Sequence, residues 1–237
     1  PGAAAVVVSV VHITRGLAAP PHLLDGRLVD GISSLLNSGT QQVAPLVLFA
    51  NQNKSHIGSL VHGTGFTLEA EAAQALTQRD ARNKNVLFPY LGGEDLNTAP
   101  DQIPSRWVIN FFDWPIEAAE NYPDCFDIVR RLVKPHRDEV KRKAYRDKWW
   151  QYAEKQQALY RAIARQKRAI AVAVVSKTVA FAFVPVNWVF AHKVVVFPFD
   201  DGAHFAVLQS SLHYFWAWKY SSTMKTDLNY SPTDCFQ

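Results

Sequence analysis

The sequence predicts an α+β fold in which mixed sheets pack against helices. Runs of β-branched and aromatic residues are typical of strands, while other segments carry apolar residues on one helical face. Strands and helices do not alternate regularly and no internal repeat is visible, which argues against a doubly wound sheet and a solenoid. With 237 residues, 48% hydrophobic and 19% charged, the chain can build one substantial core or two smaller ones, and a division into two lobes near residue 124 stays open.

Local signals predict the elements in chain order. Residues 4–13 predict a strand, and a loop-rich region continues to residue 53. In 56–68 we expect a short strand, a glycine-rich turn and the start of a helix, with Thr67 as N-cap and an end near Arg79. The other expected elements are an extended segment at 86–96 that turns at Gly92–Gly93, a strand at 106–112, helix starts at Pro115 and Pro123, strands at 169–175, 178–184 and 193–199, and a helix from about His204 to Tyr220.

Two of these helices carry an apolar face. Such a stripe is typical of a helix that packs on a core. The two faces consist of Ile128, Val129, Leu132 and Val133, and of Phe205, Leu208, Leu212, Phe215 and Trp216.

Hydropathy and cysteine usage exclude several classes of protein. No apolar run approaches the roughly 20 residues that cross a bilayer, so we expect no membrane segment. Cys125 and Cys235 are far apart and form no CxxC pair, which favours reduced thiols in a cytoplasmic protein over a disulfide framework or a zinc ribbon. Because the chain opens on Pro1 and its one methionine is Met224, we expect a piece of a longer protein.

Positive charge is concentrated in one part of the chain. Residues 130–168 hold 14 Lys/Arg against 4 Asp/Glu, whereas the rest of the chain is acidic. Clustering of this kind favours a surface that faces a polyanion, and guanidinium groups suit phosphate oxygens. The alternative is a solvated helix that rests on the core through Trp149 and Trp150. The expected phosphate contacts lie in residues 130–148, here called the basic tract, and are Arg130, Arg131, Lys134, Arg137, Lys141, Arg142, Lys143, Arg146 and Lys148.

A nuclease pattern overlaps the basic tract. Asp124 follows a proline, and Glu139 and Lys141 complete the PD…ExK spacing of Mg²⁺-dependent nucleases. That site is normally built on strands, whereas 138–148 is too charged for a buried strand and Pro123 is expected to begin a helix. A self-contained nuclease therefore remains the alternative function, and an RNA-binding module is a weaker third option.

The motifs of an S-adenosylmethionine-dependent methyltransferase are missing from the sequence. Such an enzyme needs a glycine-rich turn after a strand and an Asn/Asp-Pro-Pro-aromatic tetrapeptide that holds the flipped base. The nearest tetrapeptide, at 19–22, is Ala-Pro-Pro-His, which is typical of a stiff loop. We therefore expect no catalytic residue, cofactor or metal site in this chain.

Seven collinear segments resemble one family of enzymes. They are PYLGGEDL (89–96), RWVINF (106–111), AAENYP (118–123), VKPHRD (133–138), KWW (148–150), VLQSSLH (207–213) and YSPTDCF (230–236). Together they resemble the target-recognition region of MmeI-like (type IIG/IIL) enzymes, bacterial single-chain restriction-modification proteins that methylate adenine at N6 in DNA. Two departures are Asn110, where an aspartate is commoner, and the Ala/Val-rich 169–186, which does not align well.

The resemblance implies a division of roles between this chain and a parent enzyme. Residues 1–15 would be the end of a methyltransferase segment and 16–237 a DNA target-recognition domain. The partners would be double-stranded DNA and the methyltransferase domain of the same parent chain, in the bacterial cytoplasm. S-adenosylmethionine and Mg²⁺ would belong to the parent, which also carries the endonuclease.

The resemblance also singles out Lys225 and Asp227 as residues that read one base pair at the edge of the target. A lysine can donate to guanine O6 and N7, and an aspartate can accept from cytosine N4, so the pair would specify G·C. Residues two apart in an extended segment point the same way, which would bring both to one base pair. The alternative is an ordinary surface Lys–Asp ion pair.

Overall fold

The structure is a computed structural model that describes residues 15–16, 21–33, 38 and 45–237. It divides into two compact units, Pro1–Val47 and Leu48–Gln237. The predicted strand at 4–13 lies outside the described residues. The same holds for nearly all of segment 1–15, so the expected boundary after residue 15 stays a prediction.

The described part of the first unit contains a small hairpin. Strands β1 (His22–Leu24) and β2 (Arg27–Val29) pair antiparallel around the turn Asp25–Gly26. The φ angles of these turn residues are 50° and 76°, and an Asp-Gly dipeptide favours this left-handed conformation. The sequence predicted only a loop-rich region here and did not identify this hairpin.

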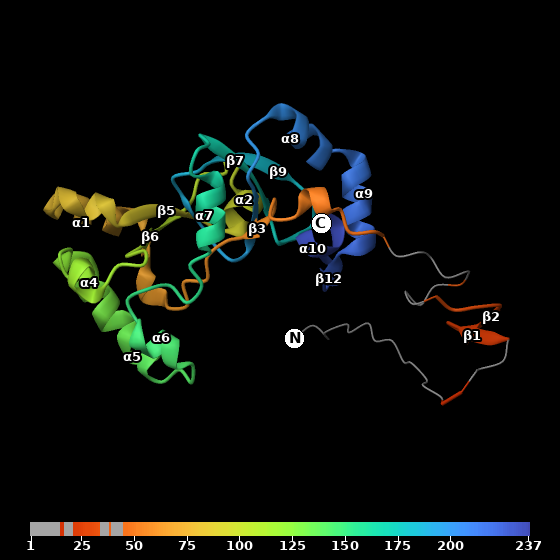
Figure 1. Ribbon diagram of the computed structural model, residues 1–237, viewed down its shortest axis with the longest axis horizontal. Helices are drawn as coiled ribbons and strands as arrows, with labels where there is room; N and C mark the ends of the chain where they lie inside the picture. Colours follow the sequence, from red (N-terminus) through yellow and green to blue (C-terminus); the bar gives the residue numbers. More distant parts are fainter. Residues whose placement is uncertain (1–14, 17–20, 34–37, 39–44) are drawn as a thin grey trace, which may run out of the picture. The chain divides into compact units, whose positions relative to one another are not determined.

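Four strands of the second unit form sheet A (Figure 1). Their order is β10 (Val189–Phe190), β5 (Leu87–Leu91), β6 (Arg106–Ile109) and β4 (Thr67–Glu69). The pair β10–β5 is parallel and the others are antiparallel. β5 and β6 confirm the predicted strands, but Thr67 pairs with Val108 instead of capping a helix. Since β4 continues to Glu69, helix α1 (Ala70–Arg79) begins only after it.

Helices and turns cover sheet A and enclose one core. The prolines begin helices as predicted: α3 (Ile116–Ala119) follows Pro115, and α4 (Pro123–Leu132) starts on Pro123. Of the predicted apolar face of α4, Val129 and Val133 are fully buried, whereas Leu132 is 51% exposed. The shorter elements up to residue 147 are the 3-10 helices at Phe49–Asn51, Thr64–Phe66 and Ala81–Asn85, and the helices α2 (Gly93–Thr98), α5 (Lys134–Asp138) and α6 (Lys143–Asp147).

Sheet B explains the Ala/Val-rich segment that aligns poorly with the family. Its antiparallel order is β3 (His56–Ile57), β11 (Val194–Phe197), β7 (Arg168–Ala173) and β9 (Phe181–Pro185). Successive residues of β7 point to opposite faces. Small alanines face the core that contains α7 (Gln157–Ile163), while Ile170 and Val172 face the core beneath the C-terminal helices. Both faces are buried, so the strand reads as a continuous apolar run.

The C-terminal part departs from the prediction of a single helix at about 204–220. Two helices, α8 (Gly202–Leu208) and α9 (Ser211–Tyr220), are separated at Ser210, whose Oγ accepts a hydrogen bond from His213 N at 3.2 Å. The break between the two helices also interrupts the expected apolar stripe, and Leu212 is 78% exposed. The chain ends with sheet C, in the order β12 (Ser222–Met224), β13 (Asp227–Asn229) and β8 (Val175–Ser176), and with α10 (Pro232–Cys235).

Candidate nucleic-acid interface

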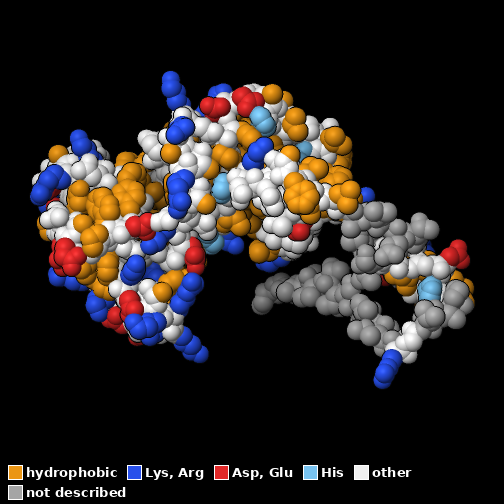
Figure 2. All heavy atoms as spheres, viewed as in Figure 1, with side chains coloured by type: hydrophobic (Ala, Val, Ile, Leu, Met, Phe, Trp, Pro, Cys, Tyr) orange, Lys and Arg blue, Asp and Glu red, His pale blue; other side chains and the backbone are white. Residues whose placement is uncertain are grey.

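The basic tract occupies the end of α4, all of α5 and α6, and the turns between them. Figure 2 shows its Lys and Arg side chains interspersed with Asp and Glu rather than forming one uniform blue face. Six predicted phosphate contacts are exposed and two, Lys134 and Arg146, are partly exposed. The exposed six are Arg130, Arg131, Lys141, Arg142, Lys143 and Lys148.

Most cations of the tract already have a partner. Three ion pairs have the i,i+3 or i,i+4 spacing of a helix: Arg130 with Asp127 at 2.7 Å, Lys134 with Asp138 at 2.7 Å, and Lys143 with Asp147. Arg142 Nη1 lies 3.1 Å from Glu154 Oε1. Exposed ion pairs are worth less than about 1 kcal/mol, so each of these cations can exchange its carboxylate for a phosphate at small cost.

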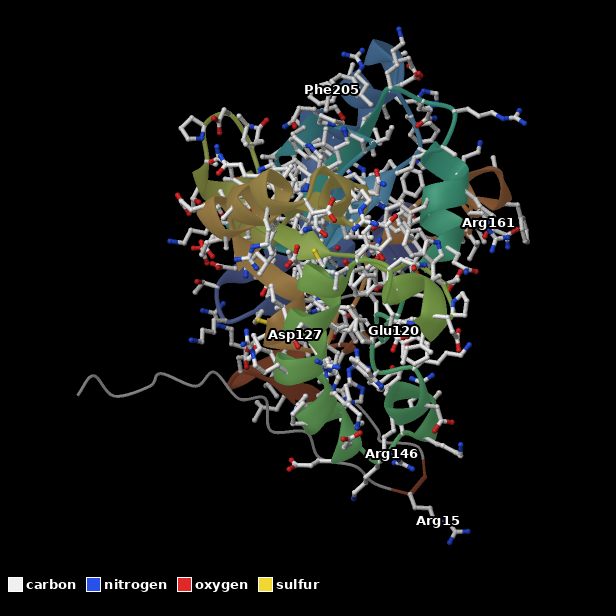
Figure 3. All side chains as sticks on the ribbon, turned by 90° about the vertical axis from the view of Figure 1, so that its left-hand side faces the viewer. Arg15, Glu120, Asp127, Arg146, Arg161 and Phe205 are labelled. Atoms are coloured by element: carbon white, nitrogen blue, oxygen red, sulfur yellow. The ribbon has the colours of Figure 1, made fainter. Side chains whose placement is uncertain are left out.

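Arg146 plays a local structural part, and three other cations are unpaired. Arg146 Nη1 donates to the carbonyl oxygens of Val140 (2.6 Å) and Lys141 (2.8 Å), which ties α6 to the turn before it. Figure 3 shows this residue at the foot of the helical segment, below Asp127 of α4. Within the described residues, the side chains of Arg131, Lys141 and Lys148 have no hydrogen-bonding or ion-pair partner.

The tryptophans of the tract belong to the protein core. Trp149 is 7% exposed and packs 5.3 Å from Phe126, ring centre to ring centre. Trp150 is 9% exposed, and its Nε1 donates to Trp114 O at 3.0 Å. The interpretation that these rings fix the tract to the core is therefore confirmed for the aromatic residues, while the cations around them stay at the surface.

Arg137 departs from its expected role as an exposed phosphate ligand. The side chain is 0% exposed, and its Nη2 donates to the carbonyl oxygens of Val61 (2.9 Å) and Gln151 (3.3 Å). α5 follows α4 almost without interruption, which turns Arg137 inward one turn beyond the buried Val133. Charge counted along the sequence gives no sign of this inward orientation.

The nuclease alternative is contradicted by the positions of its three residues. Asp124 stands at the start of α4, where its carboxylate contacts Arg79 at 3.2 Å and Asn83 Nδ2 at 3.1 Å. Glu139 follows the end of α5, and about 1.5 Å of rise per residue places the two carboxylates on the order of 20 Å apart. Lys141 lies in the next turn. Within the described ranges no group of three or more His, Cys, Asp and Glu residues could hold a metal ion.

Lys225 and Asp227 lie at the tip of the β12–β13 hairpin. Met224 pairs with Asp227, so Lys225 and Thr226 form a two-residue turn, and Lys225 has a left-handed φ of 58°. The expectation of one extended segment is therefore wrong. Lys225 is exposed, Asp227 is partly buried, and neither belongs to an ion pair in the described part of the chain. The alternative of an ordinary surface pair is thus not observed.

A cavity of about 680 Å³ lies beside this hairpin and reaches Val61, whose carbonyl oxygen accepts a hydrogen bond from Arg137 of the basic tract. Its lining runs from Thr64 past Arg106 to Met224, and includes the exposed His192 and Lys193 of the turn between β10 and β11. Burial, followed by the charge of Lys193, lowers the pKa of His192. The sequence analysis missed these residues, because no spacing pattern joins them; only the pairing of β10 with sheet A and β11 with sheet B brings them together.

The fold and these surfaces define a recognition domain of α+β type, and comparison with known proteins identifies its family. The family model "MmeI, target recognition domain" matches residues 49–237, so the chain belongs to this family. The solved structure of the type IIL restriction-modification enzyme MmeI in complex with DNA has a similar fold, with a TM-score of 0.71 and 14% identity. The match covers 89% of this chain and 28% of that protein. The comparison with curated protein sequences gave no match.

No helix in the described residues is long and apolar enough to cross a membrane. This agrees with the hydropathy of the sequence. The expected absence of a cofactor stays a prediction.

Proposed function

We propose that this chain recognises a short sequence in double-stranded DNA for a restriction-modification enzyme that methylates adenine at N6. The proposal places catalysis, S-adenosylmethionine and Mg²⁺ in other domains of the parent chain, including the methyltransferase domain. The family match supports it, since MmeI was solved in complex with DNA. A calorimetric titration of this chain with S-adenosylmethionine should show no binding; stoichiometric binding would contradict this part.

The observation that carries the proposal is the arrangement of the hairpin tip and the tract. The hairpin presents one cation and one anion that are not paired with each other, and the cavity beside it reaches Val61, the hydrogen-bond partner of Arg137. Figure 1 shows α6 and β12 on the same, lower side of the second unit. Phosphate contacts set the register of a protein on a duplex, whereas base edges in the major groove are read by donors and acceptors. The tract suits the first task and Lys225 with Asp227 the second.

The test is a selection of duplexes from a random library. The wild-type chain should enrich a short motif with G·C at one edge position. The double swap Lys225→Glu with Asp227→Arg should change the preference at that position alone, while each single change should cost about 1–3 kcal/mol of affinity.

The matched control is another Lys/Asp exchange, Lys134→Asp with Asp138→Lys, which keeps an ion pair on α5. It should leave the motif unchanged. An identical motif after the hairpin swap would refute base reading by Lys225 and Asp227. Absence of any motif for the wild-type chain would refute sequence recognition by this chain.

A further inference from the structure

Arg137 is a buried charge without a counter-charge. None of the ion pairs of the described residues includes it, and its Nε and Nη1 have no hydrogen-bond acceptor. Its hydrogen-bond acceptors are the two carbonyl oxygens of Val61 and Gln151. Burying an arginine in this state is costly, because a charge taken out of water needs an opposite charge or a full set of acceptors. An anion would compensate it.

A cavity with room for that anion adjoins Arg137. It has a volume of about 350 Å³, and its lining includes Arg137, Arg142, Tyr145, Lys148 and Lys155. The guanidinium carbons of Arg137 and Arg142 lie 5.2 and 4.4 Å from the centre of the Tyr145 ring. Two cations therefore flank one aromatic side chain at the edge of the cavity.

In the described part of the chain, two of the four cations that line the cavity are paired with carboxylates. Arg142 is paired with Glu154, and Lys155 Nζ lies 2.6 Å from Asp113 Oδ1. Lys148 is exposed and has no partner in the described residues. The carboxylate of Asp147 also lines the cavity and is paired with Lys143. Among the cations of the lining, Arg137 and Lys148 are thus the two without a carboxylate partner in the described residues.

His62 lies near the same positive charges. The ring of His62 lies 5.4 Å from that of His136 and 5.9 Å from that of Tyr145. Burial lowers the pKa of His62, and the charges of Arg137 and His136 lower it further. His62 also has a left-handed φ of 49°, a conformation that costs a non-glycine residue energy and is often retained at functional sites.

We propose that this cavity holds one phosphate group of the DNA backbone, bound by Lys148 at its mouth above the buried Arg137. The inference rests on the proposed function and sharpens it: one phosphate is held in a preformed pocket, whereas the rest of the tract makes exchangeable surface contacts. Arg137 acts as a positioning residue, because its buried charge beside the cavity attracts an anion and its Nη2 holds the segments around Val61 and Gln151.

The test compares Lys148→Gln with Lys141→Gln. Both lysines are exposed and unpaired members of the tract, but only Lys148 lines the cavity. Arg137 is not the residue to replace, since its hydrogen bonds to Val61 and Gln151 also hold the fold together. The readouts are the Tm in inorganic phosphate against chloride at equal ionic strength, and the Kd for a fixed duplex.

Phosphate should raise the Tm of the wild type and of Lys141→Gln, and should raise that of Lys148→Gln clearly less. The duplex Kd should rise about tenfold more for Lys148→Gln than for Lys141→Gln, as expected for loss of a charge-assisted hydrogen bond in a pocket. Equal effects of the two changes on both readouts would overturn the inference. A Lys148-dependent effect of phosphate with equal duplex affinities would assign the cavity to free phosphate and overturn its role in DNA binding.

This experiment separates the inference from the proposed function. If the wild-type chain binds no duplex, the proposed function fails, and the comparison in inorganic phosphate still decides whether the cavity is an anion site.

Discussion

Replacing three consecutive cations of the basic tract should weaken binding to every duplex alike. The perturbation is Lys141→Gln, Arg142→Gln and Lys143→Gln in one chain. Lys141 is unpaired, whereas Arg142 and Lys143 are paired with Glu154 and Asp147. Because exposed pairs contribute less than about 1 kcal/mol, all three cations are expected to turn to phosphate when DNA is present.

The magnitude follows from counterion release. Each phosphate contact on B-DNA contributes about −0.9 to the slope of log K against log salt, so the triple change should flatten the slope by about 2.7 units. When the salt concentration rises from about 50 to about 200 mM, each phosphate contact lowers the affinity by a factor of about 3.5, and three contacts lower it by a factor of about 40. If Arg142 and Lys143 kept their carboxylates, the slope would change by only about 0.9.

The assay is fluorescence anisotropy of two labelled duplexes, one carrying the selected motif and one scrambled, over a salt series. Lys54→Gln is the matched control, since Lys54 is exposed and unpaired in the described residues but lies outside the tract. It should leave the slope unchanged. A loss confined to the motif duplex, or an unchanged slope in the triple variant, would refute the assignment of these cations to phosphate.

Three further predictions concern stability. Lys225→Gly should raise the free energy of unfolding by about 0.5–1 kcal/mol, because the left-handed conformation strains a lysine, and should weaken duplex binding; a loss of stability would contradict this. Ser210→Ala should lower it by about 1 kcal/mol in urea titrations through loss of the α9 N-cap, and an unchanged midpoint would argue against the cap. Burial lowers the pKa of His213, so the unfolded chain takes up a proton near pH 6.5 that the folded chain does not, and stability should fall as the pH drops below that value. His213→Gln should reduce this loss in thermal melts at pH 7.5 and 5.5, and an unchanged loss would contradict the assignment to His213.

The elements that the sequence predicted well are those whose signal is local. A proline supplies a helical φ at the first turn, so the starts of α3 and α4 could be placed from Pro115 and Pro123 alone. The strands of sheet B follow from β-branched runs. Ser210 is a residue type that favours the start of a helix, but the apolar periodicity across it suggested one continuous helix. Most of that apolar stripe is exposed in the structure.

The site was less predictable because its chemistry depends on partners from distant segments. Pairs such as Lys134–Asp138 follow helical spacing and could have been anticipated. Glu154 as the partner of Arg142, and the burial of Arg137 against Val61, depend on how α5 and α6 lie against the segments that carry Val61 and Glu154. Counting charge in the tract therefore located the basic surface but overstated the number of free cations.

The two charged surfaces differ in a way that lets affinity and specificity be measured separately. Attraction for a polyanion comes from uncompensated cations, and the tract supplies three of them in the described residues, Arg131, Lys141 and Lys148. The hairpin tip carries Lys225 and Asp227, whose charges cancel, so it adds little net attraction but offers a donor and an acceptor to base edges. The hairpin swap also preserves net charge. It should therefore change the selected motif at an unchanged salt slope, whereas changes in the tract should alter the slope at an unchanged motif.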